Sequence, residues 1–326
     1  MMKPSMITRR HVLAATAGLA ALAAGDAQAQ QRFASMFVFV PAGPGGGWDG
    51  LGRAVEQVAR GAGLVGSFQF ENVGGAGGMV GLPRFAGQRR GRGDAIMIGG
   101  SVMVGAGITN RSPVTIKDVV PVARMTAEVG VIVVPANSEY QNVGQLVAAL
   151  RANPGAVAVG GGSAGGTDHI TLGLILKALG RNPREASYVA FAGGGPAQAA
   201  IMGGQVKAGI SGLSEFAEQI KAGRMRALAT TGETRSEPGL PTLKEGGLDV
   251  VTANWRGIFG APGITAAQRT ALVGLMTAVH ETAAWREMLA TRGWDDFFLT
   301  GDAFTAALAK DIADTETVLR DLGLAS

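Results

Sequence analysis

A strand-like run that ends among glycines and continues with helical spacing recurs along this chain and limits the folds that it can adopt. The first such unit spans Met36 to Arg53: the apolar run 37–40 stops at Pro41, passes a glycine-crowded turn and resumes at Asp49 with helical spacing. Glycine lets the backbone turn its N–H groups inward, and Asp49 can cap the helix that follows. Such a loop is suited to hold an anion by backbone N–H groups.

The same pattern predicts the fold class. Further strands are expected over 67–73, 94–98, 156–159, 187–191 and 206–211, and glycine clusters follow most of them. Strands that alternate with helices pair in parallel, so the loops at their carboxyl ends converge on one sheet edge. We therefore expect an α/β protein with two lobes, each a mostly parallel sheet flanked by helices.

The pattern starts over after residue 125, which predicts where the lobes divide. Lobe 1 is expected to comprise residues 30–125 with 250–326 and lobe 2 residues 126–249, so the chain crosses between them twice and permits a hinge. Thr265 and Gln268 predict a capping box for a helix that reaches about residue 281. Asp302 is expected to cap a last helix whose apolar side holds Phe304, Leu308, Ile312 and Leu319. These terminal helices are expected to cover lobe 1.

The first 29 residues predict an export signal rather than part of the fold. Arg9 and Arg10 precede an apolar run, and the small residues 27–29 suit a signal peptidase. The segment 8–13 resembles a twin-arginine signal, and an ordinary secretory signal is the alternative. Both place the mature protein in the periplasm.

Composition excludes several classes of protein. A hydrophobic share of 47% with 17% charged residues argues against a disordered chain. Removing the leader takes three of the 29 basic and one of the 25 acidic residues, and the remaining net charge of +2 gives no reason to expect nucleic acid binding. The chain has no cysteine, hence no disulfide and no thiolate chemistry. No apolar run after the leader approaches the roughly 20 residues of a membrane span.

Two enzyme motifs overlap between Gly160 and Gly165. The G-x-S-x-G pattern around Ser163 is typical of a hydrolase nucleophile, but neither His169, near the start of the same predicted helix, nor His280, inside another helix, suits a triad. The G-x-G-x-x-G pattern also fits a dinucleotide fingerprint, although here a different glycine loop opens the fold. The chain has no P-loop, and two widely separated histidines without a carboxylate cluster predict no metal site.

The predicted loops offer backbone N–H groups and hydroxyls but almost nothing that titrates near neutral pH. Catalysis generally needs a tuned acid, base, nucleophile or metal, whereas binding does not. The residues therefore favour a binding protein without a cofactor. Within the loops, His169 can contact a ligand or close its helix. Trp48 is expected to face the site, with core packing as the alternative.

Motifs along the mature chain resemble the tripartite tricarboxylate transporter substrate-binding proteins, also called the Bug family. They are Pro41 to Asp49 with Arg53, Asn72 to Gly78, Gly162 to His169, Gly193 to Ala197 with Gly203 to Val206, Arg226 to Ala229, and Pro241 to Gly247. The resemblance implies a type II periplasmic binding fold that closes on a small carboxylate. It also implies delivery to a membrane permease of one large and one small subunit.

The resemblance further implies that the first-lobe glycine loop and second-lobe amides hold one ligand carboxylate. The candidate ligand-binding residues are Gly43, Gly45, Gly46, Gly47, Trp48, Asp49, Gly77, Ser101, Ser163, Gly165, Thr167, His169, Gly193, Gly194, Gly195 and Ser211. The chain departs from common members at Ser211 to Ser214, where an acidic or amide residue is frequent, which leaves the identity of the carboxylate open. A monomer is expected, and a sensor that presents its ligand to a signalling protein is the alternative to transport.

Overall fold

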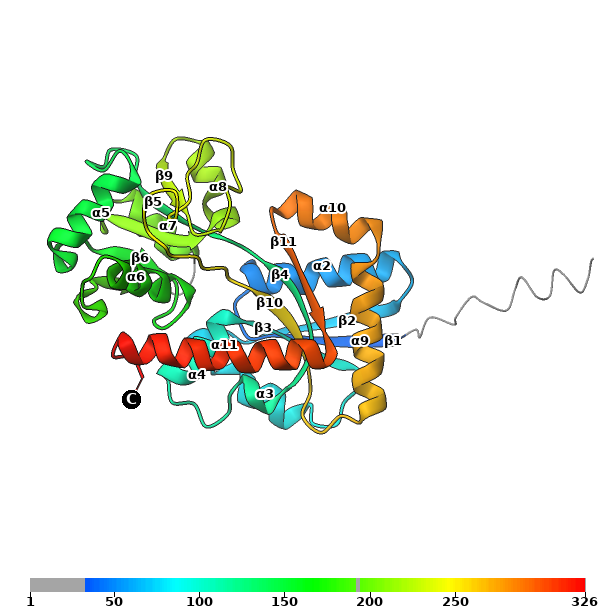
Figure 1. Ribbon diagram of the computed structural model, residues 1–326. Helices are drawn as coiled ribbons and strands as arrows, with labels where there is room; N and C mark the ends of the chain where they lie inside the picture. The colour runs from blue at the N-terminus through cyan, green and yellow to red at the C-terminus, as the bar shows by residue number, and fades with distance from the viewer. Residues whose placement is uncertain (1–32, 192–193, 326) are drawn as a thin grey trace, which may run out of the picture.

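Two sheets, each flanked by helices, form two lobes in the computed structural model, which confirms the expected fold class (Figure 1). The structure describes residues 33–191 and 194–325. The predicted leader and Gly193 lie outside these residues. We call the part built on the six-stranded sheet the first lobe and the part built on the five-stranded sheet the second lobe.

The first lobe contains a mixed sheet in the order β11-β4-β10-β3-β1-β2. Its strands are β1 (Phe33–Val40), β2 (Val65–Asn72), β3 (Ala95–Gly100), β4 (Val120–Ala127), β10 (Arg256–Gly260) and β11 (Asp295–Thr300). The expected parallel pairing holds for β1 with β2 and β3, whereas β10 and β11 pair antiparallel with their neighbours, so this sheet is mixed rather than mostly parallel as expected. The helices are α2 (Gly47–Gly61), α3 (Gly81–Gln88), α4 (Ser101–Thr109), α9 (Ala266–His280), α10 (Ala283–Arg292) and α11 (Gly301–Asp321).

The second lobe contains a mixed sheet in the order β7-β6-β8-β5-β9. Its strands are β5 (Gly130–Pro135), β6 (Val159–Gly161), β7 (Tyr188–Ala190), β8 (Ala208–Gly212) and β9 (Met225–Thr230). β6 pairs in parallel with β7 and β8, whereas β5 is antiparallel to β8 and β9. The helices are α5 (Val143–Ala152), α6 (Thr167–Ala178), α7 (Gly194–Met202) and α8 (Leu213–Lys221). Short 3₁₀ turns are η1 (Ala76–Gly78), η2 (Ile116–Asp118), η3 (Pro154–Ala156) and η4 (Pro183–Glu185).

Apolar burial explains why the site loops lie where they do. Every residue of β3 is buried, and α2 packs its Leu51, Val55 and Val58 face into the same core. Burying a side chain of this size contributes about 1.5 to 3 kcal/mol, so the strand and the helix are fixed on both sides of the loop that joins β1 to α2. The carboxyl ends of β1, β2 and β3 therefore hold their loops at one sheet edge.

Two chain segments join the lobes, one between β4 and β5 and the other between β9 and β10. They hydrogen-bond to each other where they cross: Glu128 N donates to Asn254 O over 3.1 Å, and Asn254 N donates to Glu128 O over 2.8 Å. This paired crossing brings residues far apart in sequence to the edge where the site loops end. No helix within 33–191 or 194–325 combines the length and apolar composition that a bilayer crossing requires.

The helix-start predictions had different outcomes. The Thr265 capping box is present, with Thr265 Oγ1 accepting from Gln268 N and the Gln268 side chain accepting in return. The prediction for Asp302 was wrong, because α11 begins at Gly301 after Thr300 and has no side-chain cap. Asp302 lies in the first turn, where it accepts from Arg269 Nη1 over 2.8 Å. The apolar side of α11 is buried as expected.

Candidate ligand-binding site

The loop between β1 and α2 is held in shape by Asp49. Its Oδ2 accepts from Gly45 N over 3.1 Å, and its Oδ1 accepts from Asn72 Nδ2 over 3.0 Å. Asp49 is therefore structural, but it lies in the first turn of α2 rather than at the cap, which is Gly46. Gly45 has a φ of +83°, a conformation that glycine adopts without strain. A Cβ at Gly43 or Gly45 would meet no atom within 4 Å, so this loop borders open space.

Trp48 packs into the core, so the expectation that it faces the site was wrong. Its exposed fraction is 8%, and a Cβ added at Gly78 would lie 3.0 Å from Trp48 Cζ3. The reason is helical spacing, because α2 starts at Gly47 and so places Trp48 on the buried face of Leu51 and Val55.

Gly77 packs on α4, and Ser101 is the first residue of that helix. Gly77 has a φ of +61°, and a Cβ there would lie 2.5 Å from Ala106 Cβ, so glycine allows the close approach. Ser101 Oγ donates to Asn254 Oδ1 and to Trp255 O, each over 3.2 Å. The Ser101 hydroxyl thus joins α4 to the second crossing segment rather than remaining free.

The second-lobe loop 162–166 is closed by two neighbouring side chains of α6. Asp168 Oδ2 accepts from Gly162 N over 2.8 Å, and His169 Nδ1 accepts from Gly165 N over 3.2 Å. The His169 ring stacks on Tyr188 with centroids 4.2 Å apart. Burial lowers the pKa of His169 to about 4 and raises the pKa of Asp168 to about 7. His169 is therefore a neutral acceptor that shapes the loop.

The two lobes touch at this loop. A Cβ added at Gly105 of α4 would lie 2.0 Å from Gly165 O, and one added at Gly165 would lie 2.3 Å from Thr109 Cγ2. Gly166 likewise lies next to Val102 of α4. The helix that carries Ser101 and packs on Gly77 therefore abuts the loop that carries Ser163, Gly165 and Thr167.

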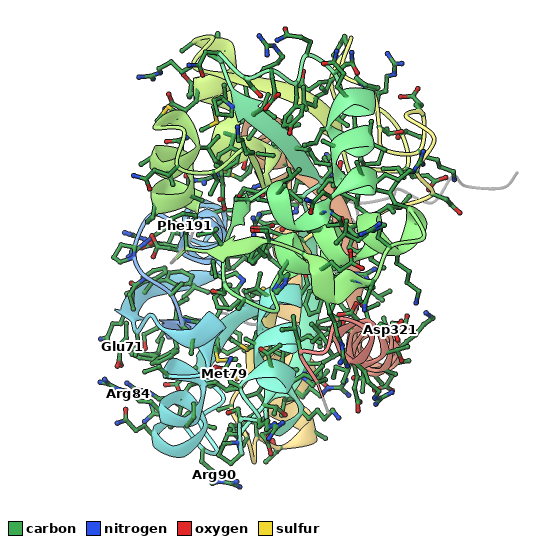
Figure 2. The ribbon with its side chains drawn as sticks, turned by 90° about the vertical axis from the view of Figure 1, so that its left-hand side faces the viewer. Glu71, Met79, Arg84, Arg90, Phe191 and Asp321 are labelled. Carbon is green, nitrogen blue, oxygen red and sulfur yellow. The ribbon has the colours of Figure 1, made fainter. Side chains whose placement is uncertain are left out.

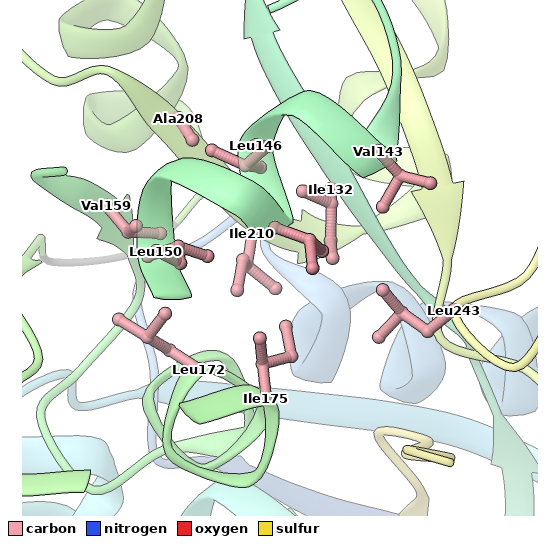
Figure 3. A pocket seen from close by; sticks show the side chains of 11 residues that line it. Ile132, Val143, Leu146, Leu150, Val159, Leu172, Ile175, Ala208, Ile210 and Leu243 are labelled. Atoms are coloured by element: carbon pink, nitrogen blue, oxygen red, sulfur yellow. The ribbon is translucent and has the colours of Figure 1, made fainter. Parts of the chain in front are cut away.

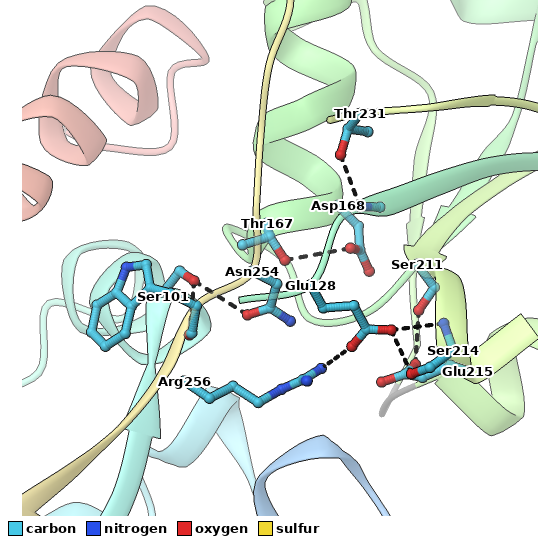
Figure 4. A network of polar contacts seen from close by, with 12 residues as sticks. Ser101, Glu128, Thr167, Asp168, Ser211, Ser214, Glu215, Thr231, Asn254 and Arg256 are labelled. Atoms are coloured by element: carbon cyan, nitrogen blue, oxygen red, sulfur yellow. Dashed lines mark hydrogen bonds and ion pairs between the residues drawn. The ribbon is translucent and has the colours of Figure 1, made fainter. Parts of the chain in front are cut away.

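A buried ion pair joins the site elements of both lobes (Figure 4). Arg256 Nη2 lies 2.6 Å from Glu128 Oε2, and the two side chains are 2% and 1% exposed. Glu128 Oε1 accepts from Ser214 N over 2.7 Å at the start of α8. On the other side, a Cβ added at Gly47 would lie 2.6 Å from Arg256 Nη2. The pair thus connects the start of α2 with the start of α8.

Ser211 and Glu215 lie beside this pair. Ser211 is buried, and its hydroxyl donates to Glu215 Oε2 over 2.8 Å. Protein atoms around the carboxyl group of Glu215 reduce its hydration and raise its pKa. The residue as a whole is nevertheless exposed to solvent. Among the predicted residues in the second lobe, Gly194 and Gly195 begin α7, and a Cβ at Gly195 would meet no atom within 4 Å.

Sequence reasoning missed Glu128, Glu215 and Arg256. A signal for Glu128 was present, since it is a lone charge between two apolar strand runs, a placement that needs a partner. Nothing in the sequence indicates that the partner is Arg256, because Glu128 lies on the first crossing segment and Arg256 begins β10, after the second.

Three hollows of the structure lie away from the predicted site residues. The one in Figure 3 is an apolar gap of about 10 Å³ in the second-lobe core, lined by residues such as Ile132, Leu172 and Ile210. Two open hollows of about 480 and 830 Å³ lie on the first lobe, and neither is lined by a predicted site residue. Within the described residues, no group of three or more His, Asp or Glu side chains is placed to hold a metal.

Comparison with known proteins identifies the family. The family model described as tripartite tricarboxylate transporter family receptor matches residues 57–324. Protein BugT of Bordetella pertussis is 25% identical over 318 residues, which cover 96% of this chain and 95% of that protein. A Cupriavidus necator protein is 26% identical over 196 residues, which cover 60% of this chain and 59% of that protein.

Solved structures share the fold. MatC from Rhodopseudomonas palustris with bound malate has a TM-score of 0.73 at 20% identity, with 89% of this chain and 98% of that chain covered. A second R. palustris protein, solved with adipate, has a TM-score of 0.78 at 23% identity, with 91% and 99% covered.

The family consists of receptors and not of enzymes, so the hydrolase alternative at Ser163 is wrong. The geometry agrees: because His169 Nδ1 accepts from Gly165 N, the neutral ring carries its hydrogen on Nε2, and neither nitrogen is then available to take a proton from a serine hydroxyl. The chain belongs to the tripartite tricarboxylate transporter family of receptors.

Proposed function

We propose that this protein captures a small carboxylate between its lobes and delivers it to a tripartite permease with one large and one small membrane subunit. In this proposal, residues 30–125 with 250–326 form one lobe, residues 126–249 form the other, and the two crossing segments act as the hinge. The protein reaches the periplasm through the twin-arginine-like leader and acts as a monomer.

The observation that carries the proposal is the lack of side-chain caps on helices that start at the site. α2, α4 and α6 begin after Gly46, Gly100 and Gly166 and have no side-chain cap, whereas at the start of α8 Glu128 Oε1 already accepts from Ser214 N. Away from the site, α5, α9 and α10 begin with the capping side chains of Asn142, Thr265 and Thr282, whereas α3 and α11 have no side-chain cap. Helix starts without caps leave N–H donors and the positive end of the helix dipole for an anion.

The magnitudes are sufficient for a transport receptor. A micromolar dissociation constant corresponds to about 8 kcal/mol. Hydrogen bonds to a charged group contribute about 1.5 to 3 kcal/mol each, so roughly four amides from the two lobes meet the requirement. The two R. palustris neighbours, solved with malate and with adipate, support a carboxylate as the ligand class.

Two glycine-to-arginine substitutions test the site, one at the proposed ligand space and one as a control. Gly46 lies at the start of α2, and a Cβ there would come no closer than 4.0 Å to another residue, so arginine fits the fold but fills the ligand space. Gly61 at the other end of α2 also borders open space and is the matched control. We expect mono-, di- or tricarboxylates to raise the melting temperature of the wild type and of Gly61→Arg, but not of Gly46→Arg.

Ser163→Tyr provides a second test from the other lobe and is expected to abolish the same shift. Wild-type carboxylate affinity in both Gly46→Arg and Ser163→Tyr would overturn the site assignment. A wild-type protein, free of bound ligand, that responds to no carboxylate would overturn the proposed ligand class.

A further inference from the structure

The carboxylate of Glu128 is bound by both lobes at once. Its Oε2 lies 2.6 Å from Nη2 of Arg256, which begins β10 in the first lobe. Its Oε1 accepts from Ser214 N over 2.7 Å, and also from the Ser214 hydroxyl, in the first turn of α8 in the second lobe (Figure 4). Glu128 itself lies on the first crossing segment. One side chain at the hinge therefore connects the two lobes.

Glycine brings the backbone of a helix start close to each end of this ion pair. A Cβ added at Gly212, just before α8, would lie 2.7 Å from Glu128 Oε1. One added at Gly47, where α2 begins, would lie 2.6 Å from Arg256 Nη2. The carboxylate thus lies against the start of α8 and the guanidinium against the start of α2. A rotation of one lobe against the other must therefore disturb these contacts.

Separating the contacts is unfavourable, because both charged groups are buried. The Glu128 and Arg256 side chains are 1% and 2% exposed, and within the described residues Glu128 is the only hydrogen-bond partner of the Arg256 guanidinium. Breaking the pair leaves a buried charge without compensation. Lys177 and Asp321 also pair between the lobes, but their side chains are 58% and 41% exposed, so this pair restrains the lobes little.

We infer that Glu128 is a positioning residue that holds the lobes of the ligand-free protein in the arrangement in which their glycine loops bind the ligand. Its effect on affinity rests on the proposed function, whereas its effect on the lobe arrangement does not. A receptor that occupies the competent arrangement for only a fraction of the time binds more weakly by that fraction. Loss of the Glu128 charge should therefore free the lobes and weaken ligand binding.

Paired spin labels can report the lobe arrangement, because the chain has no cysteine of its own. Gly61→Cys and Lys221→Cys place one label at the end of α2 and one at the end of α8, both at exposed residues. Pulsed electron paramagnetic resonance of the ligand-free protein should give one narrow distance distribution. Glu128→Gln keeps an acceptor for Ser214 N but removes the charge that Arg256 needs, so it should broaden the distribution. A saturating carboxylate should narrow it again.

Calorimetric titration of the unlabelled proteins with succinate, malate, adipate and citrate measures the effect on binding. For each of these that binds the wild type, we expect Glu128→Gln to weaken binding about tenfold or more, as when the competent fraction falls to about a tenth. Glu245→Gln is the matched control, because Glu245 Oε2 accepts from Thr242 N over 2.9 Å and from Arg235 Nε over 2.8 Å within the second lobe alone. It should keep the wild-type distance distribution and affinity.

Glu128→Leu combined with Arg256→Met gives a second altered protein, in which neither charge is left buried and unpaired. It should broaden the distribution and weaken binding in the same way, even if Glu128→Gln does not fold. A broad distribution in the ligand-free wild type would overturn the role of Glu128, as would a wild-type distribution or wild-type affinity in the altered proteins, and the proposed function would stand. If the wild type binds none of the four carboxylates, the proposed function fails, and the distance distributions alone decide the role of Glu128.

Discussion

At the scale of single residues, the neighbours Asp168 and His169 perform the same task with opposite electrostatic consequences. Each accepts a backbone N–H of the loop 162–166 and thereby fixes its shape. Burial disfavours the charged form of both, which raises the pKa of Asp168 from 3.8 to about 7 and lowers the pKa of His169 from 6.5 to about 4. Around pH 5 the folded protein therefore holds one proton more on Asp168 and one fewer on His169 than the unfolded chain.

The two shifts predict offsetting pH dependence of the free energy of unfolding. The contribution of Asp168 to the free energy of unfolding is present at low pH and is lost as pH rises from about 4 to about 7. The His169 contribution is present above pH 6.5 and is lost as pH falls toward 4. Asp168→Asn should therefore lose stability, relative to the wild type, on acidification from 6.5 to 4, by up to about 1.4 kcal/mol per pH unit.

His169→Gln should show the opposite slope over the same range and gain stability on acidification relative to the wild type. Urea unfolding at several pH values measures both differences, and comparison with the wild type at each pH cancels the other titrating groups. Parallel pH profiles for all three proteins would contradict the assigned roles.

At this scale the sequence predicted residue types better than residue roles. The glycines of both loops and Asp49 were found from local pattern, because a turn and a first-turn carboxylate depend on near neighbours in the chain. Trp48 was misplaced because its direction depends on where α2 begins. Glu128 and Arg256 were missed because their pairing depends on the crossing of two segments 128 residues apart.

At the scale of elements, the start of α2 depends on the buried ion pair beneath it. A Cβ at Gly47 would lie 2.6 to 2.7 Å from the Nη2, Cζ and Nε atoms of Arg256, whereas one at Gly46 would lie 4.0 Å from Gly43 O. Arg256 cannot move away freely, because Glu128 holds Nη2 and the side chain is 2% exposed. The buried ion pair therefore requires a glycine at position 47.

Gly47→Ala should therefore destabilise the protein more than Gly46→Ala. Breaking a buried ion pair costs about 3 to 5 kcal/mol, and the higher helix propensity of alanine offsets up to about 1 kcal/mol. We expect a net loss of roughly 2 to 4 kcal/mol for Gly47→Ala and less than about 1 kcal/mol for Gly46→Ala. Denaturant unfolding compares the two, and equal midpoints would show that Arg256 rearranges without cost.

The elements themselves were predictable where one face is buried. Strands β3 and β5 and helix α2 have apolar patterns that match their burial, whereas β2 and β7 are largely exposed. The strand β11 was not anticipated, because it begins with Asp295 and Asp296 and lies at the sheet edge, where pairing with β4 stabilises it. The order of strands in each sheet also arises from long-range packing, which local patterns do not encode.

At the scale of the whole molecule, α11 connects the two lobes. Phe304 near its start packs on Trp255 and Phe259 of the first lobe. At its other end, Leu322 packs on Gly173 of α6, and Asp321 pairs with Lys177. Figure 1 shows α11 running along the first lobe to end beside α6, and Figure 2 labels Asp321 at that end. The terminal helices were expected to cover the first lobe, and α11 extends beyond it.

The contact between Leu322 and Gly173 predicts that the effect of Gly173→Ala on the free energy of unfolding changes sign when Leu322 is truncated. A Cβ at Gly173 would lie 2.2 Å from Leu322 Cδ2, so Gly173→Ala should destabilise the wild type by about 1 to 3 kcal/mol through overpacking. In a Leu322→Ala background the space is free, and the same substitution should stabilise α6 by roughly 0.5 to 1 kcal/mol, because alanine is the better helix former.

Urea unfolding of the four proteins measures this double-mutant cycle. Gly180→Ala cannot replace Gly173→Ala in this experiment, because Gly180 has a φ of +71° and alanine would be strained there. A Gly173→Ala effect of the same sign in both backgrounds would mean that the end of α11 does not pack on α6 in solution. The expected reversal would instead show that the lobes share a third connection besides the two crossing segments. Any hinge motion that captures the ligand must then pivot about the end of α11 or release it.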